Sequence, residues 1–152
     1  MRVEFLGTGS CLPDNEATDT ASLLIERHIM VDTGWNPIRN LLRAGVEPGQ
    51  VTHLFFTHMH QDHYLGLAQF LFYRITKYQR VDDLTIYGPE GLEEVVRRTL
   101  MYAGFDEIVV GGERRPVADE KPHVVELPCE VEYELNGFSV RFIKSLHTTP
   151  SR

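Results

Sequence analysis

Short apolar segments, separated by glycine and polar turns, recur along the 152 residues of the chain. Runs of four or five mostly apolar residues are typical of strands, whereas apolar residues three or four positions apart are typical of helices. The two spacings alternate over the first two thirds of the chain. They predict strands at 3–7, 22–26, 29–34, 53–57, 84–88 and 107–110, and helices at 36–44, 62–78 and 89–100.

The last third of the chain carries strand patterns without helical spacing. These segments lie at 123–127, 131–135 and 138–146, and Asn136-Gly137 between the last two is a strong hairpin signal. We therefore expect these later strands to be antiparallel. Strands alternating with helices, followed by hairpins, predict a mixed α/β fold in which residues 1–152 form a single domain.

Composition and charge narrow the class of protein. The chain is 42% hydrophobic and 24% charged, and no apolar run approaches membrane-spanning length. Its N-terminus lacks the apolar region of a signal peptide, and Cys11 and Cys129 are too few for a secreted disulfide framework. We therefore predict a cytoplasmic location and no membrane partner. The net charge of −7 argues mildly against broad nucleic-acid binding, although bound metal cations would reverse the local field.

One segment, THMHQDHYLG at 57–66, concentrates ligand-type side chains directly after an apolar run. Residues two apart in an extended segment point to the same side, so His58 and His60 can bind one ion. A turn into the following helix would direct Asp62 and His63 toward a second ion. Neutral imidazoles and carboxylates suit Zn²⁺, Mn²⁺ or Fe. The alternative is a helix N-terminus capped by Asp62, with histidines that are ordinary polar loop residues.

This His-x-His-x-Asp-His pattern resembles the signature of the metallo-β-lactamase superfamily, and the chain is similar to its ribonuclease Z-like branch in particular. The segments that carry the resemblance cover essentially the whole chain: FLGTGS, LLIERHIMVDTG, NLLRAG, THLFFTHMHQDHYLGL and LTIYGPEGLEE. The resemblance implies an αβ/βα sandwich with the metals at one edge of two facing sheets.

The resemblance also gives roles to two residues outside the motif. His147 matches a histidine that completes the first metal site together with His58 and His60, and its alternative is a polar residue in a flexible C-terminal tail. Asp32 matches a buried aspartate beneath the metal site. It either orients a metal-binding side chain through a hydrogen bond or is a turn aspartate bonded to its own backbone.

The chemistry expected of such a site is hydrolysis. Two neighbouring cations lower the pKa of a bound water, hold hydroxide ready at neutral pH and polarise the bond to be cleaved. Asp62 would then be both a metal ligand and the catalytic group that guides the proton of that water. We predict a hydrolase with one or two zinc ions, acting on a phosphodiester or ester-type bond of a small-molecule or phosphodiester substrate.

The segment CLPDNEATDTAS at 11–22 departs from the ribonuclease Z-like pattern, which typically carries Lys or Arg there. This chain has Asp14, Glu16 and Asp19 instead. An acidic rim repels a polyanion, which disfavours nucleic acid and leaves tRNA 3′ processing as an alternative function. A modest basic cluster, which we interpret as a solvated helix face, comprises Arg74, Lys77 and Arg80.

The chain ends at Arg152, whereas the resembled family continues past the histidine that matches His147 to a metal-bridging aspartate and a final histidine. We therefore expect the N-terminal half to two thirds of the sandwich, inactive or nearly so by itself. Its uncovered apolar sheet face would promote self-association. The alternative is a non-catalytic metal-binding or interaction module, because the second metal site lacks ligands.

Overall fold

The computed structural model describes residues 1–12, 18–102, 107–110, 113–116, 121–135 and 137–144. The helices are α1 (Pro37–Arg43), α2 (Gln61–Tyr64), α3 (Leu67–Tyr78) and α4 (Leu92–Tyr102), with one turn of 3₁₀-helix at Pro48–Gln50. The strands are β1 (Val3–Gly7), β2 (Ser22–Ile25), β3 (Ile29–Val31), β4 (His53–Phe55), β5 (Thr85–Gly88), β6 (Glu107–Val110), β7 (Glu113–Pro116), β8 (His123–Glu126), β9 (Glu132–Leu135) and β10 (Phe138–Arg141).

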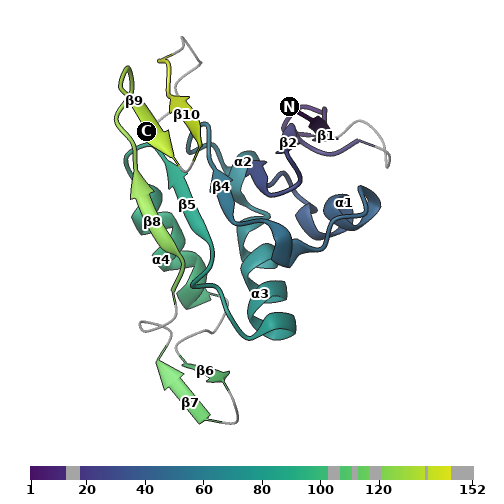
Figure 1. Cartoon of the computed structure of the whole chain (residues 1–152). Coiled ribbons are helices and arrows are strands. Elements are labelled where there is room, and N and C mark those ends of the chain that lie inside the picture. Colours follow the sequence, from purple (N-terminus) through teal and green to yellow (C-terminus); the bar gives the residue numbers. More distant parts are fainter. Residues whose placement is uncertain (13–17, 103–106, 111–112, 117–120, 136, 145–152) are drawn as a thin grey trace.

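A six-stranded sheet in the order β1-β2-β3-β4-β5-β8 forms the centre of the structure (Figure 1). β1, β2 and β3 are antiparallel neighbours, whereas β3, β4, β5 and β8 run parallel to one another. Parallel strands end at the same edge of a sheet, and ligand sites of α/β proteins form there. The segments that follow β3 and β4, which contain Asp32 and the histidine motif, therefore meet at one edge.

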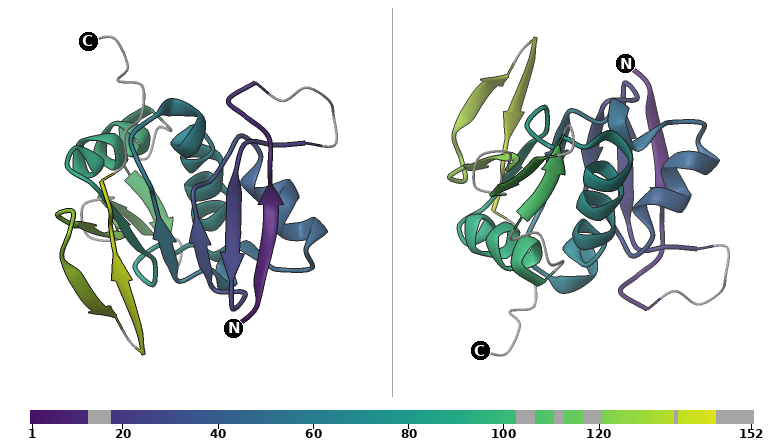
Figure 2. Two further views of the ribbon diagram at one scale, coloured as in Figure 1. Left: turned by 90° about the horizontal axis from the view of Figure 1, so that it is seen from above. Right: turned by 90° about the horizontal axis from the view of Figure 1, so that it is seen from below.

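Alternate residues of the central strands face two separate apolar layers. The larger layer lies between the sheet and the helices, where Met30, Leu54 and Ile86 pack with residues of α1, α3 and α4. On the opposite face, Phe55 and Tyr87 pack against the β9–β10 hairpin. Figure 2 shows this hairpin standing apart from the helices. One mixed sheet between helices and a hairpin confirms the predicted α/β pattern.

The predicted helix 62–78 is interrupted, which corrects the expectation of one continuous helix. α2 ends at Tyr64 and α3 begins at Leu67, with Gly66 buried between them. The amide of Gly66 donates a hydrogen bond of 3.0 Å to the carbonyl of Gly34. A Cβ at this position would lie 2.6 Å from that carbonyl oxygen and 2.6 Å from Cδ of Pro37. The close approach of the loop after β3 therefore requires glycine and separates the two helices.

The later strands differ from their prediction in two respects. β8 pairs parallel with β5, so the expectation that segment 123–127 would be antiparallel was wrong. β7, with the sequence ERRP, was not predicted because it lacks an apolar run. The predicted hairpin is confirmed, since β9 and β10 pair antiparallel around Gly137, whose φ is 99°. Among the described residues, no helix is long and apolar enough to cross a membrane.

Candidate metal centre

The histidine motif follows β4 as an extended turn that leads directly into α2. His60 is the last extended residue before the helix, with φ −75° and ψ 141°. The ring centroids of His58 and His60 lie 4.5 Å apart, and those of His58 and His63 lie 4.1 Å apart. Thr33 holds α2 in this place, because its backbone amide and its hydroxyl donate to the carbonyl of His63 at 2.8 and 2.9 Å. The fold thus brings the three imidazoles of the motif together.

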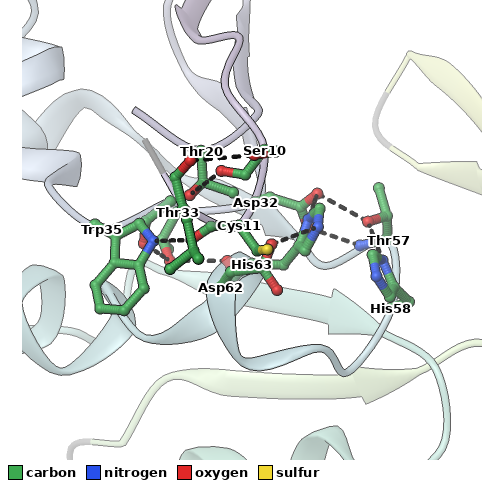
Figure 3. A network of polar contacts seen from close by, with 12 residues as sticks. Ser10, Cys11, Thr20, Asp32, Thr33, Trp35, Thr57, His58, Asp62 and His63 are labelled. Carbon is green, nitrogen blue, oxygen red and sulfur yellow. Dashed lines mark hydrogen bonds and ion pairs between the residues drawn. The ribbon is translucent and has the colours of Figure 1, made fainter. Parts of the chain in front are cut away.

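Asp32 lies beside His63, between it and Thr57 (Figure 3). Its backbone adopts a left-handed conformation with φ 54°, and its side chain is buried. The carboxylate accepts hydrogen bonds from the amide and the hydroxyl of Thr57, at 2.9 and 2.8 Å, and from Nδ1 of His63 at 2.7 Å. The structure thus brings Asp32 into direct contact with one predicted ligand and, through Thr57, with the start of the motif.

These hydrogen bonds determine which nitrogen of each imidazole can bind a cation. A carboxylate only accepts, so Nδ1 of His63 carries the proton and Nε2 of the neutral ring carries the lone pair. The Thr57 hydroxyl donates its only proton to Asp32, so its oxygen accepts a hydrogen bond from Nδ1 of His58 at 3.0 Å. Nε2 of neutral His58 therefore also carries a lone pair. Sequence reasoning missed Thr57, whose only signal was its place between β4 and the motif.

The environment of His63 fits a cation. Nε2 of His63 lies 3.5 Å from Oδ2 of Asp62, and two ligands of one tetrahedral zinc ion are about 3.4 Å apart. A lone pair that faces a carboxylate oxygen is stabilised by a proton or a metal ion between them. The hydrogen bond to Asp32 raises the pKa of His63, burial opposes this rise, and the charges of Asp32 and Asp62 add to it. The donor set therefore matches the imidazole and carboxylate ligands that zinc prefers.

The described residues do not supply a complete metal site. Within them, no group of three or more His, Cys, Asp or Glu side chains is arranged to hold a metal ion. His58, His60, Asp62, His63 and Asp32 are close neighbours, whereas His147 lies outside the described residues. The predicted ligand set thus remains a prediction.

Asp19 has a different place from the one predicted, since it is buried rather than part of an acidic rim. Its carboxylate accepts hydrogen bonds from the amides of Trp35 and Asn36, at 3.0 and 2.9 Å, and from the side chain of Asn40 at 2.6 Å. It therefore holds the loop before α1 and adds no charge to the surface. The other two acidic residues of that segment, Asp14 and Glu16, lie outside the described residues.

The basic cluster also differs from its prediction. Arg74 is buried and donates to the carbonyls of Pro48 and Val51 at 2.7 and 2.8 Å, so it is not part of a solvated helix face. Its guanidinium also pairs with Asp83 at 2.5 Å. The other two cations pair with acidic side chains, Lys77 with Glu47 at 2.6 Å and Arg80 with Asp82 at 3.3 Å.

Comparison with known proteins gives the chain a family and a fold. The model of one protein family, described as Anti-Pycsar protein Apyc1, matches residues 1–152. Ribonuclease Z of Latilactobacillus sakei is 33% identical over 97% of this chain and 50% of its own length. The crystal structure of the short form of human tRNase Z is 30% identical, with a TM-score of 0.57, over 67% of this chain and 39% of that chain.

A further crystal structure, the metallo-β-lactamase fold protein YhfI of Bacillus subtilis, shares the fold over 97% of this chain and 54% of that chain. Its TM-score is 0.68 and its identity 15%. The predicted resemblance to metallo-β-lactamase proteins of the ribonuclease Z-like branch is therefore confirmed, as is the metallo-β-lactamase-type fold class. The chain spans about half the length of the ribonuclease Z relatives it matches.

Proposed function

Because the chain belongs to the family of Anti-Pycsar protein Apyc1 and has a metallo-β-lactamase fold, we propose that it is part of a metal-dependent hydrolase for phosphodiester or ester-type bonds. One observation carries the proposal. The hydrogen bonds of Asp32 and Thr57 leave Nε2 of both His58 and His63 as lone-pair donors at the edge of the sheet. Ordinary polar loop histidines would not need a buried carboxylate to orient them.

In this proposal the residues of the motif have distinct roles. His58 and His60 would hold one ion together with His147, and Asp62 and His63 would hold a second. A bound zinc ion supplies a water of lowered pKa and stabilises negative charge on the bond being cleaved. Asp62 would accept a proton from the attacking water, while Asp32 keeps the ring of His63 in one tautomer. Zinc is preferred, and Mn²⁺ or Fe would suit the same donors.

An RNA phosphodiester is the second candidate substrate. The names of two relatives, ribonuclease Z and human tRNase Z, favour it, and tRNA 3′ processing is its specific form. The burial of Asp19 removes one of the three acidic residues that argued against nucleic acid. Against it, each cation of the basic cluster is paired with an acidic side chain, so this cluster offers a polyanion no unpaired charge. We therefore propose a small phosphodiester as the first candidate substrate and RNA as the second.

The proposal concerns the whole protein, because this chain spans only about half the length of the ribonuclease Z relatives it matches. The remaining metal ligands would come from residues outside those described. A non-catalytic metal-binding module stays the alternative for this chain alone. We place the protein in the cytoplasm, where Cys11 and Cys129 would remain the free, exposed thiols of the structure.

Metal analysis and a hydrolysis assay test the proposal. We expect zinc to stay bound to the full protein during dialysis at pH 7.5 and to be released below about pH 6, where histidines protonate. We also expect metal-dependent cleavage of bis-p-nitrophenyl phosphate, assayed beside a thioester and a tRNA precursor. Asp62→Ala should lower the rate at least about 100-fold without unfolding the protein. His123→Ala, at an exposed histidine on β8, is the matched control. Unchanged activity in Asp62→Ala would overturn the mechanism.

A further inference from the structure

A hollow of about 400 Å³ lies beside the histidine motif, a size that suits a small ligand or one group of a larger one. Its lining includes His60 and Asp62 together with the apolar side chains of Leu12, Trp35 and Leu65. These three side chains are 72, 41 and 45% exposed. Large apolar side chains gathered at an exposed hollow mark a binding site more often than isolated ones do.

Two hydrogen bonds anchor Trp35 in the wall of the hollow. Its backbone amide donates to the buried carboxylate of Asp19 at 3.0 Å, and its indole Nε1 donates to the carbonyl of Cys11 at 3.3 Å. Gly34 before it has φ 59°, and a Cβ there would lie 3.0 Å from the carbonyl oxygen of Thr20. The single polar atom of the indole is thus satisfied, while the rest of the ring is an apolar surface. Figure 3 shows Trp35 and Cys11 on the side of the network that carries Asp62.

The charges around the hollow indicate which part of a ligand it suits. The residues that line it include the carboxylate of Asp62 but no Lys or Arg. A phosphate group would find no cation in this wall and would be repelled by Asp62. An uncharged, flat group would instead stack on the indole and contact Met59 and Leu65. His60 and Asp62 border the hollow. An aromatic group bound there would therefore lie next to the substrate bond that is cleaved at the proposed metal site.

We propose that this hollow binds an aromatic group carried by the ester or phosphodiester substrate, with Trp35 as its stacking surface. The inference rests on the proposed function, because it takes His60 and Asp62 as part of the reacting site. It goes further by giving the substrate an aromatic substituent and by giving Trp35 the role of selecting it. Trp35 is a binding residue in this scheme and takes no part in bond cleavage.

Tryptophan fluorescence tests the proposal directly, because Trp35 is the only tryptophan of the chain. The metal-free protein is titrated with diphenyl phosphate and, separately, with dimethyl phosphate, which has the same charge and no ring. We expect a saturable change of Trp35 emission with diphenyl phosphate alone. Emission that responds equally to both ligands, or to neither, would overturn the proposal. A change that follows protein concentration instead of ligand would also overturn it, since the hollow would then bind a second copy.

Two substitutions separate stacking from folding. Both Trp35→Phe and Trp35→Ala keep the backbone amide that binds Asp19, so the loop retains that anchor. By calorimetry we expect Trp35→Phe to bind diphenyl phosphate within a few-fold of the wild type and Trp35→Ala to bind it about 10-fold more weakly. Leu42→Ala, at a 45% exposed leucine on α1 outside the hollow, is the control and should change nothing. Equal binding by all variants would contradict a stacking role.

Steady-state kinetics provide an independent test of the role of Trp35. With metal supplied, Trp35→Ala should raise KM for bis-p-nitrophenyl phosphate about 10-fold and leave kcat nearly unchanged, as expected when substrate and transition state lose the same contact. Metal-dependent hydrolysis without any effect of Trp35 would overturn the inference and leave the proposed function standing. Ring-selective binding that depends on Trp35, in a protein without any hydrolysis, would support the aromatic subsite and overturn the proposed function.

Discussion

Asp32 links the groups on which the candidate site depends. Its carboxylate contacts His63 directly and reaches His58 through the hydroxyl of Thr57, so one buried charge orients two imidazoles. The cost of burying this charge is offset by three hydrogen bonds to it. A residue that only shaped a turn would not need to bond a side chain 31 positions away. Asp32 therefore links the loop after β3 to the candidate metal ligands that follow β4.

Replacing Asp32 with asparagine should weaken metal binding. The amide offers one acceptor oxygen in place of two, so either Thr57 or His63 loses its partner and the tautomer of His63 is no longer determined. Loss of such a hydrogen-bonding partner typically lowers metal affinity about 10–100-fold. We expect this loss for Asp32→Asn in a zinc competition titration, with Asp82→Asn at an exposed aspartate as the control. Equal zinc affinity in both variants would mean that Asp32 serves the turn alone.

Asp19 supports a prediction about stability and pH. Burial by itself would raise its pKa, but hydrogen bonds from Trp35, Asn40 and two further backbone amides outweigh burial and lower the pKa below 3.8. A carboxyl group whose pKa is lowered on folding stabilises the folded state above its unfolded pKa and loses that contribution as the pH falls through the folded pKa. The stabilisation should therefore be complete above about pH 4 and decline below it.

Denaturant unfolding of Asp19→Asn between pH 2.5 and 7 measures this contribution. We expect a loss of about 1–3 kcal/mol at pH 7, because the amide turns a donor toward the amides it faces, and a smaller loss at the acid end. Glu94→Gln is the control. Its hydrogen bonds with Arg97 and Arg98 lower the pKa of Glu94 to about 2, but the carboxylate is exposed and screened, so we expect a smaller effect. A loss for Asp19→Asn that does not vary with pH would contradict the linkage.

At the scale of elements, local patterns predicted most of the structure. Strands 3–7 and 107–110 were predicted with their observed bounds, and the Asn136-Gly137 signal correctly predicted a hairpin. Three of the errors depend on partners distant in sequence, namely the parallel pairing of β8, the break at Gly66 and the burial of Arg74, whereas β7 was missed because it lacks an apolar run. The burial of Arg74 depends on two carbonyls more than 20 positions away. The same holds for the candidate site. The histidine motif could be predicted from the sequence, whereas the hydrogen bonds that Thr57 makes with Asp32 and His58 could not.

The break between α2 and α3 gives a prediction at this scale. Gly66→Ala would place its methyl group against the carbonyl of Gly34 and the ring of Pro37, and neither belongs to a flexible side chain. Overpacking of this kind typically costs about 1–3 kcal/mol, and here it would also displace α2 and its motif. We expect a lower denaturation midpoint together with weaker zinc binding.

Gly49→Ala is the matched control for Gly66→Ala. A Cβ at Gly49 would lie 2.9 Å from the ring of Tyr78, a partly exposed side chain that can shift at the cost of its hydrogen bond to Glu47, whereas Gly66 faces backbone and a proline ring. We therefore expect a smaller loss of stability and unchanged zinc binding. If both alanine variants were equally stable, the separation of α2 from α3 would have a cause other than the close approach of Gly34.

At the scale of the whole molecule, the two faces of the sheet are covered unequally. Helices cover one face, whereas the β9–β10 hairpin covers only part of the other. A hollow of about 670 Å³ remains between the sheet and β10, lined largely by apolar residues and by none of the four motif residues. Val3, which pairs with Ile25, and Phe5 continue this face at the edge strand, and they are 41 and 72% exposed. The exposed apolar surface is therefore an extended face, which favours association.

We predict that the 152-residue chain self-associates through this face, and that Phe5→Glu shifts the equilibrium toward the monomer. A charge on β1 would have to be buried without a partner in any assembly that covers the face, which is costly. Sedimentation velocity over a range of concentrations measures the shift. Met101→Glu is the matched control, because Met101 is 58% exposed but lies on α4, in the helical layer. A wild-type chain that stays monomeric at high concentration would show that this face is stable in water, and equal shifts by both variants would place the contact elsewhere.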